Sequence, residues 1–194
     1  DNTRSRGLGD VYKRQPMNVR KDTSLALSEI ILAVNHIANK NQPNALGSVG
    51  HIEVSPNSRN VIAGNSLFTV DIRSPDINKL VKMENELKQM TTDICKKYKI
   101  EFEIDQIGGF DPVAFDKECL NNIRNSANKF GYSHKDIVSG AGHDACWINT
   151  VAPSAMIMCP CVDGLSHNEA EEIKPEWASS STNVMLHAAI ASAT

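Results

Sequence analysis

The stretch LFTVDIRSPDINKLVKMENELKQMTTDICKKYKIEFEI, residues 67–104, changes its apolar period twice. Apolar and polar side chains alternate over residues 67–73, as in a strand with one apolar face. Pro75 and Asp76 then open a segment of helical period, and alternation returns over residues 100–104. A strand, a helix and a further strand are therefore predicted. The helical stripe consists of Leu80, Met83, Leu87, Met90 and Ile94.

The residues before this stretch add one helix and one strand. Apolar side chains recur at helical spacing over residues 22–40, and Asp22 or Thr23 is suited to cap the first turn. A loop rich in Asn, Pro and Gly leads to a strand predicted over residues 49–54. The order helix, strand, strand, helix, strand matches a split βαβ sandwich, βαββαβ, whose first strand is missing. We therefore expect a ferredoxin-like α/β domain over residues 16–112.

The pattern changes after Gly108 and Gly109 to short helices and strands in alternation. Such alternation is typical of α/β domains, so residues 113–194 are expected to form part of a larger one. The predicted elements are, in order, a helix over residues 116–130, a strand near Ile137, a short helix after Asp144, a strand over residues 155–159 and a helix over residues 175–191.

The first fifteen residues, DNTRSRGLGDVYKRQ, are polar, basic and aperiodic, and the pattern of a folded domain begins abruptly at Pro16. We interpret residues 1–15 as a non-native scar that replaces upstream sequence. This interpretation agrees with the missing first strand, which would lie on the same side of Pro16. These residues are therefore left out of the fold prediction.

The composition is that of a soluble globular protein. Of the 194 residues, 41% are hydrophobic and 22% charged, and the formal net charge is -3. A nucleic-acid binder would carry a basic excess, so nucleic acid is not an expected partner. The longest apolar runs, such as residues 154–161, are far shorter than the ~20 residues that cross a bilayer, so a membrane is not expected either. We expect a cytoplasmic protein.

The cysteines are scattered and odd in number, which predicts reduced thiols rather than a disulfide framework. Cys159 and Cys161 could form a zinc site with His143 and His167, but the Cys-x-Cys spacing is not that of a zinc knuckle. Buried and inert thiols are therefore the preferred interpretation. The five are Cys95, Cys119, Cys146, Cys159 and Cys161.

Several short segments place polar side chains beside glycines or at predicted strand ends, where a backbone can approach a ligand closely. They are residues 55–64 (SPNSRNVIAG), 70–73 (VDIR), 139–145 (SGAGHDA) and 164–171 (GLSHNEAE). Together with residues 16–22 (PMNVRKD) they resemble, in the same order, the motifs of N-carbamoyl-L-amino-acid hydrolases, β-ureidopropionases and allantoate amidohydrolases, a family of metal-dependent amidohydrolases.

The resemblance extends from Pro16 to the last predicted helix and assigns a role to each half of the chain. It implies that residues 16–112 form the lid, which also pairs with its twin in a homodimer. It implies that residues 113–194 form the C-terminal part of the catalytic domain. The chain would then be a C-terminal fragment of a longer enzyme.

His167 follows a glycine in the loop after a predicted apolar strand, where open α/β sheets present their ligands. On its residues alone it is either a metal ligand or a solvated loop histidine beside several acids. The resemblance implies that His167 binds one of two catalytic divalent metal ions. Zinc or manganese is expected, and cobalt and nickel suit the same ligands.

The glycine-flanked segment Gly140 to Asp144 lies between a predicted strand and a predicted helix, so its N–H groups can face an anionic or carbonyl ligand. Alternatively, the glycines make a tight turn that His143 caps. The resemblance implies that Gly142 and His143 line the substrate pocket and that Asp144 orients a neighbouring group.

Arg73 projects from its strand to the face opposite the apolar side chains, where it can meet an anion. A surface ion pair with Asp71 or Asp76 is the alternative. The resemblance implies that Arg73 holds the substrate's α-carboxylate with its guanidinium fork. It also implies that Asn60 contacts the substrate, although Ala63 stands where the family turn carries proline.

The remaining metal ligands of the family and its general-base glutamate precede Pro16, so no catalytic base is expected in this chain. A further histidine of the family stands in a His-Ala-Gly-Thr-Thr stretch at the place of residues 11–15, which read VYKRQ here. The fragment alone is therefore expected to be inactive.

For the parent enzyme the resemblance implies hydrolysis of the carbamoyl C–N bond of N-carbamoyl-L-amino acids or N-carbamoyl-β-alanine. The products are the amino acid, carbon dioxide and ammonia. Allantoate, another small ureido carboxylate, is the alternative substrate. The other functions considered are an aminoacylase or dipeptidase and an inert dimerisation or binding module.

Overall fold

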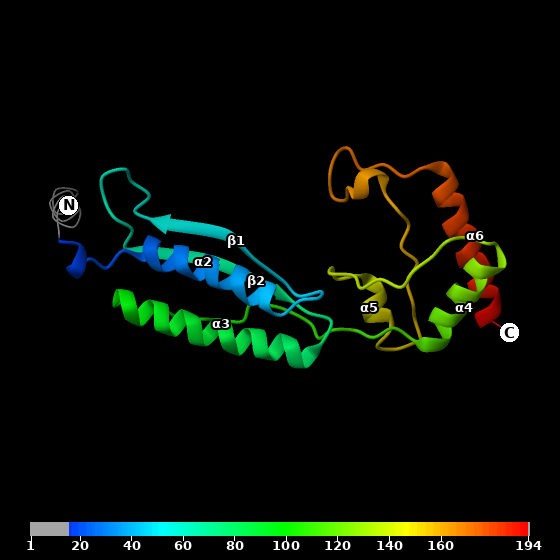
Figure 1. Cartoon of the computed structure of the whole chain (residues 1–194), viewed down its shortest axis with the longest axis horizontal. Coiled ribbons are helices and arrows are strands. Elements are labelled where there is room, and N and C mark those ends of the chain that lie inside the picture. The colour runs from blue at the N-terminus through cyan, green and yellow to red at the C-terminus, as the bar shows by residue number, and fades with distance from the viewer. Residues whose placement is uncertain (1–15, 194) are drawn as a thin grey trace. The chain divides into compact units, whose positions relative to one another are not determined.

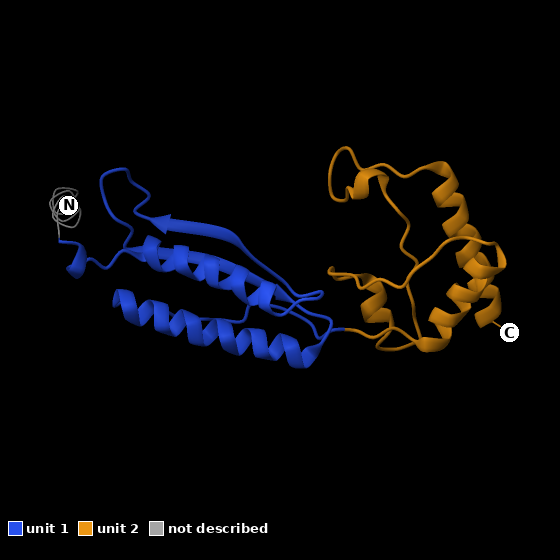
Figure 2. Ribbon diagram, in the orientation of Figure 1, with its two compact units in different colours: residues 1–112 blue, residues 113–194 orange. Residues whose placement is uncertain are grey.

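The structure is a computed structural model that describes residues 16–193. It divides into two compact units, unit 1 over Asp1–Pro112 and unit 2 over Val113–Thr194 (Figures 1 and 2). Residues 1–15, interpreted from the sequence as a scar, lie outside the described residues. The roles of lid and catalytic part assigned to residues 16–112 and 113–194 stay predictions.

Unit 1 is a small antiparallel sheet with two long helices (Figure 1). Its two strands pair with each other from Leu46 opposite Arg73 to Ser55 opposite Asn65, with an irregularity between Val49 and Ile52. Both helices contact each other and the sheet. The elements are η1 (Met17–Val19), α2 (Thr23–Lys40), β1 (Leu46–Ser55), β2 (Asn65–Arg73) and α3 (Ile77–Tyr98).

The core of unit 1 lies between the two helices and the inner face of the sheet. Ile37 of α2 and Met83 of α3 have no exposed surface, and Ile72 of β2 packs against them. Phe68 and Val70 pack against a second cluster formed mainly by α2. The predicted apolar face of β2 is thus the face that is buried.

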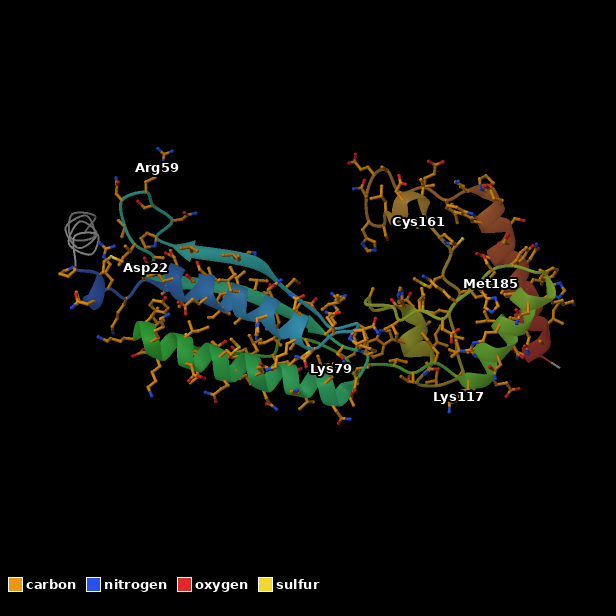
Figure 3. The ribbon with its side chains drawn as sticks, in the orientation of Figure 1. Asp22, Arg59, Lys79, Lys117, Cys161 and Met185 are labelled. Carbon is orange, nitrogen blue, oxygen red and sulfur yellow. The ribbon has the colours of Figure 1, made fainter. Side chains whose placement is uncertain are left out.

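Asp22 and Asp76 start the two helices, as the sequence predicts. The Asp22 carboxylate accepts a hydrogen bond from the Ser24 N–H at 3.0 Å at the start of α2 (Figure 3). The Asp76 carboxylate accepts from the N–H groups of Asn78 and Lys79. Each cap satisfies backbone donors that the first helical turn leaves without a partner.

The prediction of a strand over residues 100–104 is wrong. Residues 100–116 form neither helix nor strand, although Ile100 packs against the core of unit 1. A strand needs a hydrogen-bonded neighbour, and in the part of the chain that the structure describes β1 and β2 pair only with each other. The observed unit is therefore a mixed α/β arrangement with a two-stranded sheet, not the predicted ferredoxin-like set of strands.

Unit 2 consists of helices joined by extended segments (Figure 2). The predictions of strands near Ile137 and over residues 155–159 are wrong, because no strand pairing occurs among residues 113–193. The N–H of Asp116 donates to the carbonyl of Ser154 at 2.9 Å, but one such bond makes no ladder. The elements are α4 (Lys117–Lys129), α5 (Asp144–Ile148), η2 (Val162–Gly164) and α6 (Pro175–Ser192), of which α4 and α6 contact each other.

Candidate functional site

His167 lies in the exposed loop between η2 and α6. Its φ of 56° is in the left-handed region, which residues other than glycine rarely adopt. Its backbone N–H donates to the Glu171 carboxylate at 2.8 Å. The loop thus holds the backbone of His167 in a specific turn and leaves the residue exposed.

The ends of this loop are joined by two contacts. The N–H of Val162 donates to the carbonyl of Glu172 at 2.8 Å. The thiol of Cys161, which is labelled in Figure 3, donates to the Glu171 carboxylate at 3.7 Å. Burial and the negative charge of Glu171 raise the pKa of the Cys161 thiol. The thiol therefore stays protonated at neutral pH and is a hydrogen-bond donor.

His143 is the residue immediately before α5, and the N–H of Cys146 donates to its carbonyl at 2.9 Å. Its Nε2 forms a hydrogen bond with the Ser139 hydroxyl at 2.7 Å, and that hydroxyl also accepts from the Ala141 N–H at 3.2 Å. Gly142 is exposed between them. Residues 139–143 thus form a tight turn in which the His143 imidazole contacts Ser139 at the start of the same segment.

Arg73 projects from the outer face of β2, as predicted, and is about half exposed. Its Nε and one terminal nitrogen donate to the two oxygens of Asp71, at 2.9 and 2.5 Å. This forked pair lowers the pKa of Asp71 and raises that of Arg73. The ion pair considered from the sequence is therefore formed, with Asp71 as the partner.

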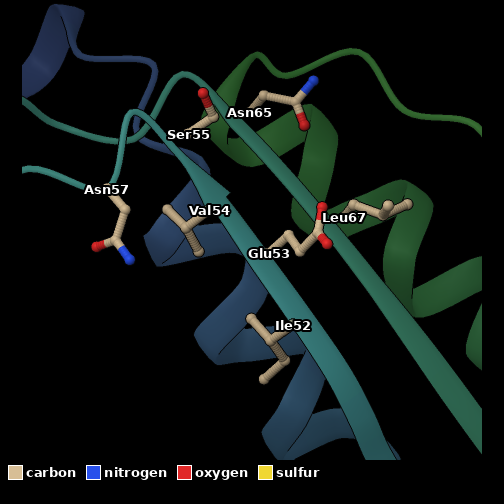
Figure 4. Close-up of a pocket in the computed structure, with 7 residues that line it drawn as sticks. All are labelled: Ile52, Glu53, Val54, Ser55, Asn57, Asn65 and Leu67. Atoms are coloured by element: carbon tan, nitrogen blue, oxygen red, sulfur yellow. The ribbon is translucent and has the colours of Figure 1, made fainter.

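Asn60 lies in the exposed connection between β1 and β2, where its N–H donates to the Ser58 hydroxyl at 3.3 Å. A hollow of about 450 Å³ lies at the base of this connection (Figure 4). None of the residues predicted to bind substrate lines it. Its lining residues are Ile52, Glu53, Val54, Ser55, Asn57, Asn65 and Leu67.

The described residues contain no complete metal site. Within residues 16–193 no group of three or more His, Cys, Asp or Glu side chains is arranged to hold a metal ion. The zinc cluster of Cys159 and Cys161 with two histidines is therefore not formed, and all five cysteines are free thiols. An imidazole such as that of His167 fits a metal as a single donor, with the other ligands supplied from elsewhere.

The predicted site residues fall into two groups. Asn60 and Arg73 belong to unit 1, whereas Gly142, His143 and His167 belong to unit 2. The sequence pointed to no role for Ser139 or Glu171, whose side chains bond to the two histidine segments. Only their position inside the quoted motifs drew attention to them.

Residues 15–191 match the sequence profile of Peptidase family M20/M25/M40, and the chain belongs to this family. Its members generally depend on two metal ions. Within the family the chain is 49% identical to an N-carbamoyl-L-amino-acid amidohydrolase of Rhizobium meliloti over 178 residues. It is 32% identical to an allantoate amidohydrolase of Escherichia coli over 157 residues. The predicted resemblance is thereby confirmed.

The structure agrees with this placement. It superimposes on a crystal structure of an amidase of the hydantoinase/carbamoylase family from Burkholderia multivorans with a TM-score of 0.86 and 45% identity, over 91% of this chain and 43% of that one. The chain also spans only 43% of the Rhizobium meliloti protein, with 92% of its own length matched. For the Escherichia coli protein these shares are 38% and 80%.

None of the helices described among residues 16–193 combines the length and the apolar character that a membrane crossing requires.

Proposed function

We propose that residues 16–193 belong to a metal-dependent amidohydrolase that cleaves the carbamoyl C–N bond of N-carbamoyl-L-amino acids. The observation that carries this proposal is the 49% identity with the N-carbamoyl-L-amino-acid amidohydrolase over 92% of the chain. Allantoate is the second candidate substrate, because the allantoate amidohydrolase of Escherichia coli is 32% identical. The difference in identity favours the carbamoyl amino acid.

His167 would serve as one ligand of the metal pair, with zinc or manganese as the first candidates. The metal ions, when bound, supply a water of pKa ~7 and polarise the ureido carbonyl. The exposed loop position of His167 supports this role, because a ligand shared with residues outside the described part must be accessible. The general base and the other ligands would come from residues outside this chain.

Arg73 would bind the carboxylate of the substrate, and Asn60 would hydrogen-bond to the same end of the molecule. The Asp71–Arg73 pair is about half exposed, and such pairs contribute ~0–1 kcal/mol to stability. A substrate carboxylate can therefore compete with Asp71 for the guanidinium fork. Asp71 would keep Arg73 extended and charged until substrate arrives.

Gly142 and His143 would hold the scissile group. The His143 imidazole is bonded to Ser139 only through Nε2, so rotation about its side-chain bonds can exchange that hydroxyl for a substrate oxygen. Closing the lid over the substrate would then exclude water other than the attacking one.

The experiment that tests the proposal replaces the matched segment of the Rhizobium meliloti enzyme by residues 16–193 of this chain. Ammonia release from N-carbamoyl-alanine, N-carbamoyl-β-alanine, allantoate and a dipeptide then identifies the substrate. We expect turnover of N-carbamoyl-alanine by this chimera and none by the present chain alone. A chimera that is folded and loaded with metal but hydrolyses only the dipeptide would refute the proposal.

The ligand role of His167 is tested in the same chimera. His167→Ala is expected to lose turnover and to bind less metal, because one donor of the metal pair is removed. His134→Ala is the matched control, since His134 is an exposed histidine of the same unit that bonds only to the Tyr132 carbonyl. Equal rate and metal content in the two variants would contradict the assignment.

We further propose a cytoplasmic enzyme that forms a homodimer through residues 16–112. The support is the resemblance of this segment to the lid of the family. Light scattering of the chimera measures the assembly directly. A monomer at micromolar concentration would refute the proposed dimer.

A further inference from the structure

The loop that carries His167 is closed at its base. Val162 and Glu172 are joined through their backbones, and the Cys161 thiol contacts the Glu171 carboxylate beside them. These two contacts therefore join the start of the loop to its end. The loop is exposed, so these bonds rather than a buried core hold its conformation.

Inside the loop, Glu171 is bonded to the tip from two directions. Its carboxylate Oε2 accepts the His167 N–H at 2.8 Å, and its own N–H donates to the Asn168 carbonyl at 2.9 Å. The Asn168 side chain in turn accepts the Ala170 N–H at 2.9 Å. The turn from His167 to Glu171 is thus closed through both backbone and side chains.

The bond to His167 is the one that controls the histidine. A residue other than glycine stays at positive φ only where its surroundings hold it there, and the φ of His167 is 56°. A hydrogen bond from a backbone N–H to a carboxylate is charge-assisted and stronger than a neutral one. Since φ fixes the direction of the Cα–Cβ bond, the same contact fixes the direction in which the imidazole leaves the backbone.

We propose that Glu171 is a positioning residue that presents the His167 imidazole to the metal through this backbone contact. The proposal rests on the metal-ligand role proposed above for His167. Both oxygens of Glu171 are engaged within the loop, Oε2 by the His167 N–H and Oε1 by the Cys161 thiol. Glu171 therefore acts on the metal through His167 and does not itself coordinate it.

The backbone contact is tested in the present chain by solvent-exchange NMR of the His167 amide at pH 7. Glu171→Ala is expected to raise the exchange rate by about tenfold or more, because the amide loses a charge-assisted bond. Glu171→Gln keeps an oxygen acceptor and is expected to retain most of the protection. Glu172→Gln is the matched control, because Glu172 is a neighbouring exposed glutamate whose side chain makes no hydrogen bond to the described residues. It should leave the rate unchanged.

The effect on the metal is tested in the chimera by zinc titration. Glu171→Ala is expected to weaken zinc binding by about 10-fold, the typical cost of removing a group that orients a ligand, and Glu171→Gln to restore most of it. Unchanged zinc affinity in Glu171→Ala, beside a weakened one in His167→Ala, would overturn the positioning role and leave the proposed function standing. Unchanged zinc affinity in His167→Ala would overturn the ligand role of His167. The exchange rate of the His167 amide would then still show whether Glu171 contacts the His167 backbone.

Discussion

Gly47 of β1 lies close to α2, and adding one methyl group there tests the packing of unit 1. A Cβ at this position would lie 3.1 Å from the Ala38 Cβ and 3.2 Å from both a methyl carbon and the carbonyl oxygen of Val34. One of these atoms belongs to the helix backbone, which cannot move aside as a flexible side chain can. Gly47→Ala must therefore push β1 and α2 apart.

Two opposing contributions set the size of the effect. Overpacking a tight core site costs typically about 1–3 kcal/mol. Replacing glycine stabilises by roughly 0.4–1 kcal/mol through the unfolded chain where the backbone allows it. Gly64→Ala is the matched control, because its added Cβ would meet nothing closer than the Ser55 carbonyl at 3.8 Å. We expect Gly47→Ala to destabilise unit 1 by about 1–2 kcal/mol relative to wild type and Gly64→Ala to be neutral or slightly stabilising.

The assay must report on unit 1 alone. Both tryptophans, Trp147 and Trp177, lie in unit 2, so their fluorescence does not follow α2. Hydrogen exchange of the α2 amides measures the opening free energy of the correct unit. Equal protection of α2 in Gly47→Ala and Gly64→Ala would refute the close packing of β1 on α2.

Two further predictions concern the helices of unit 1. Asp76→Ala is expected to destabilise α3 by about 1 kcal/mol, because two backbone N–H groups lose their acceptor. Asp76→Asn keeps an acceptor and should cost much less. Hydrogen exchange of the α3 amides compares the two variants, and equal losses of protection would refute the cap. The Glu29 carboxylate accepts from Lys97 and Tyr98, which hold its pKa below the ordinary 4.5, so its stabilising contribution is present above that pH and is lost as the pH falls through the lowered pKa. Wild type should therefore lose more stability than Glu29→Gln between pH 7 and acidic pH, and parallel pH profiles would contradict this.

The helices could be predicted from the sequence because each carries its own start signal and period. Asp22, Asp76 and Asp116 cap the helices that follow them, and Pro175 is the first residue of α6. These interactions are local, so a short window contains them. The strand β2 was found for the same reason, since its alternation reports its buried face directly.

The errors concern strands whose existence depends on a partner. Residues 100–104 alternate well, but alternation reports a face and not a neighbouring strand, and none pairs with them among the described residues. β1 begins at Leu46, earlier than predicted. The error arises because a glycine beside Asn and Pro is typical of a loop. The close approach of Gly47 to α2 involves Val34 and Ala38, which belong to a different element, so the pattern of the strand itself does not report it.

The site was predictable in its residue types and less so in its contacts. The outward direction of Arg73 follows from the strand period, and its pairing with Asp71 was one of the alternatives considered. The bonds of Ser139 to His143 and of Glu171 to His167 depend on the conformation of turns that no periodicity reports. The substrate and metal roles of these residues stay proposals that the chimera can test.

The left-handed backbone of His167 has a consequence for directed evolution. Glycine and asparagine adopt this conformation more easily than histidine, so replacing His167 by either would relax the chain locally. A screen that selects for heat resistance alone would thus favour loss of the imidazole. Libraries built on this chain should therefore keep position 167 constant, or select for turnover in the same round.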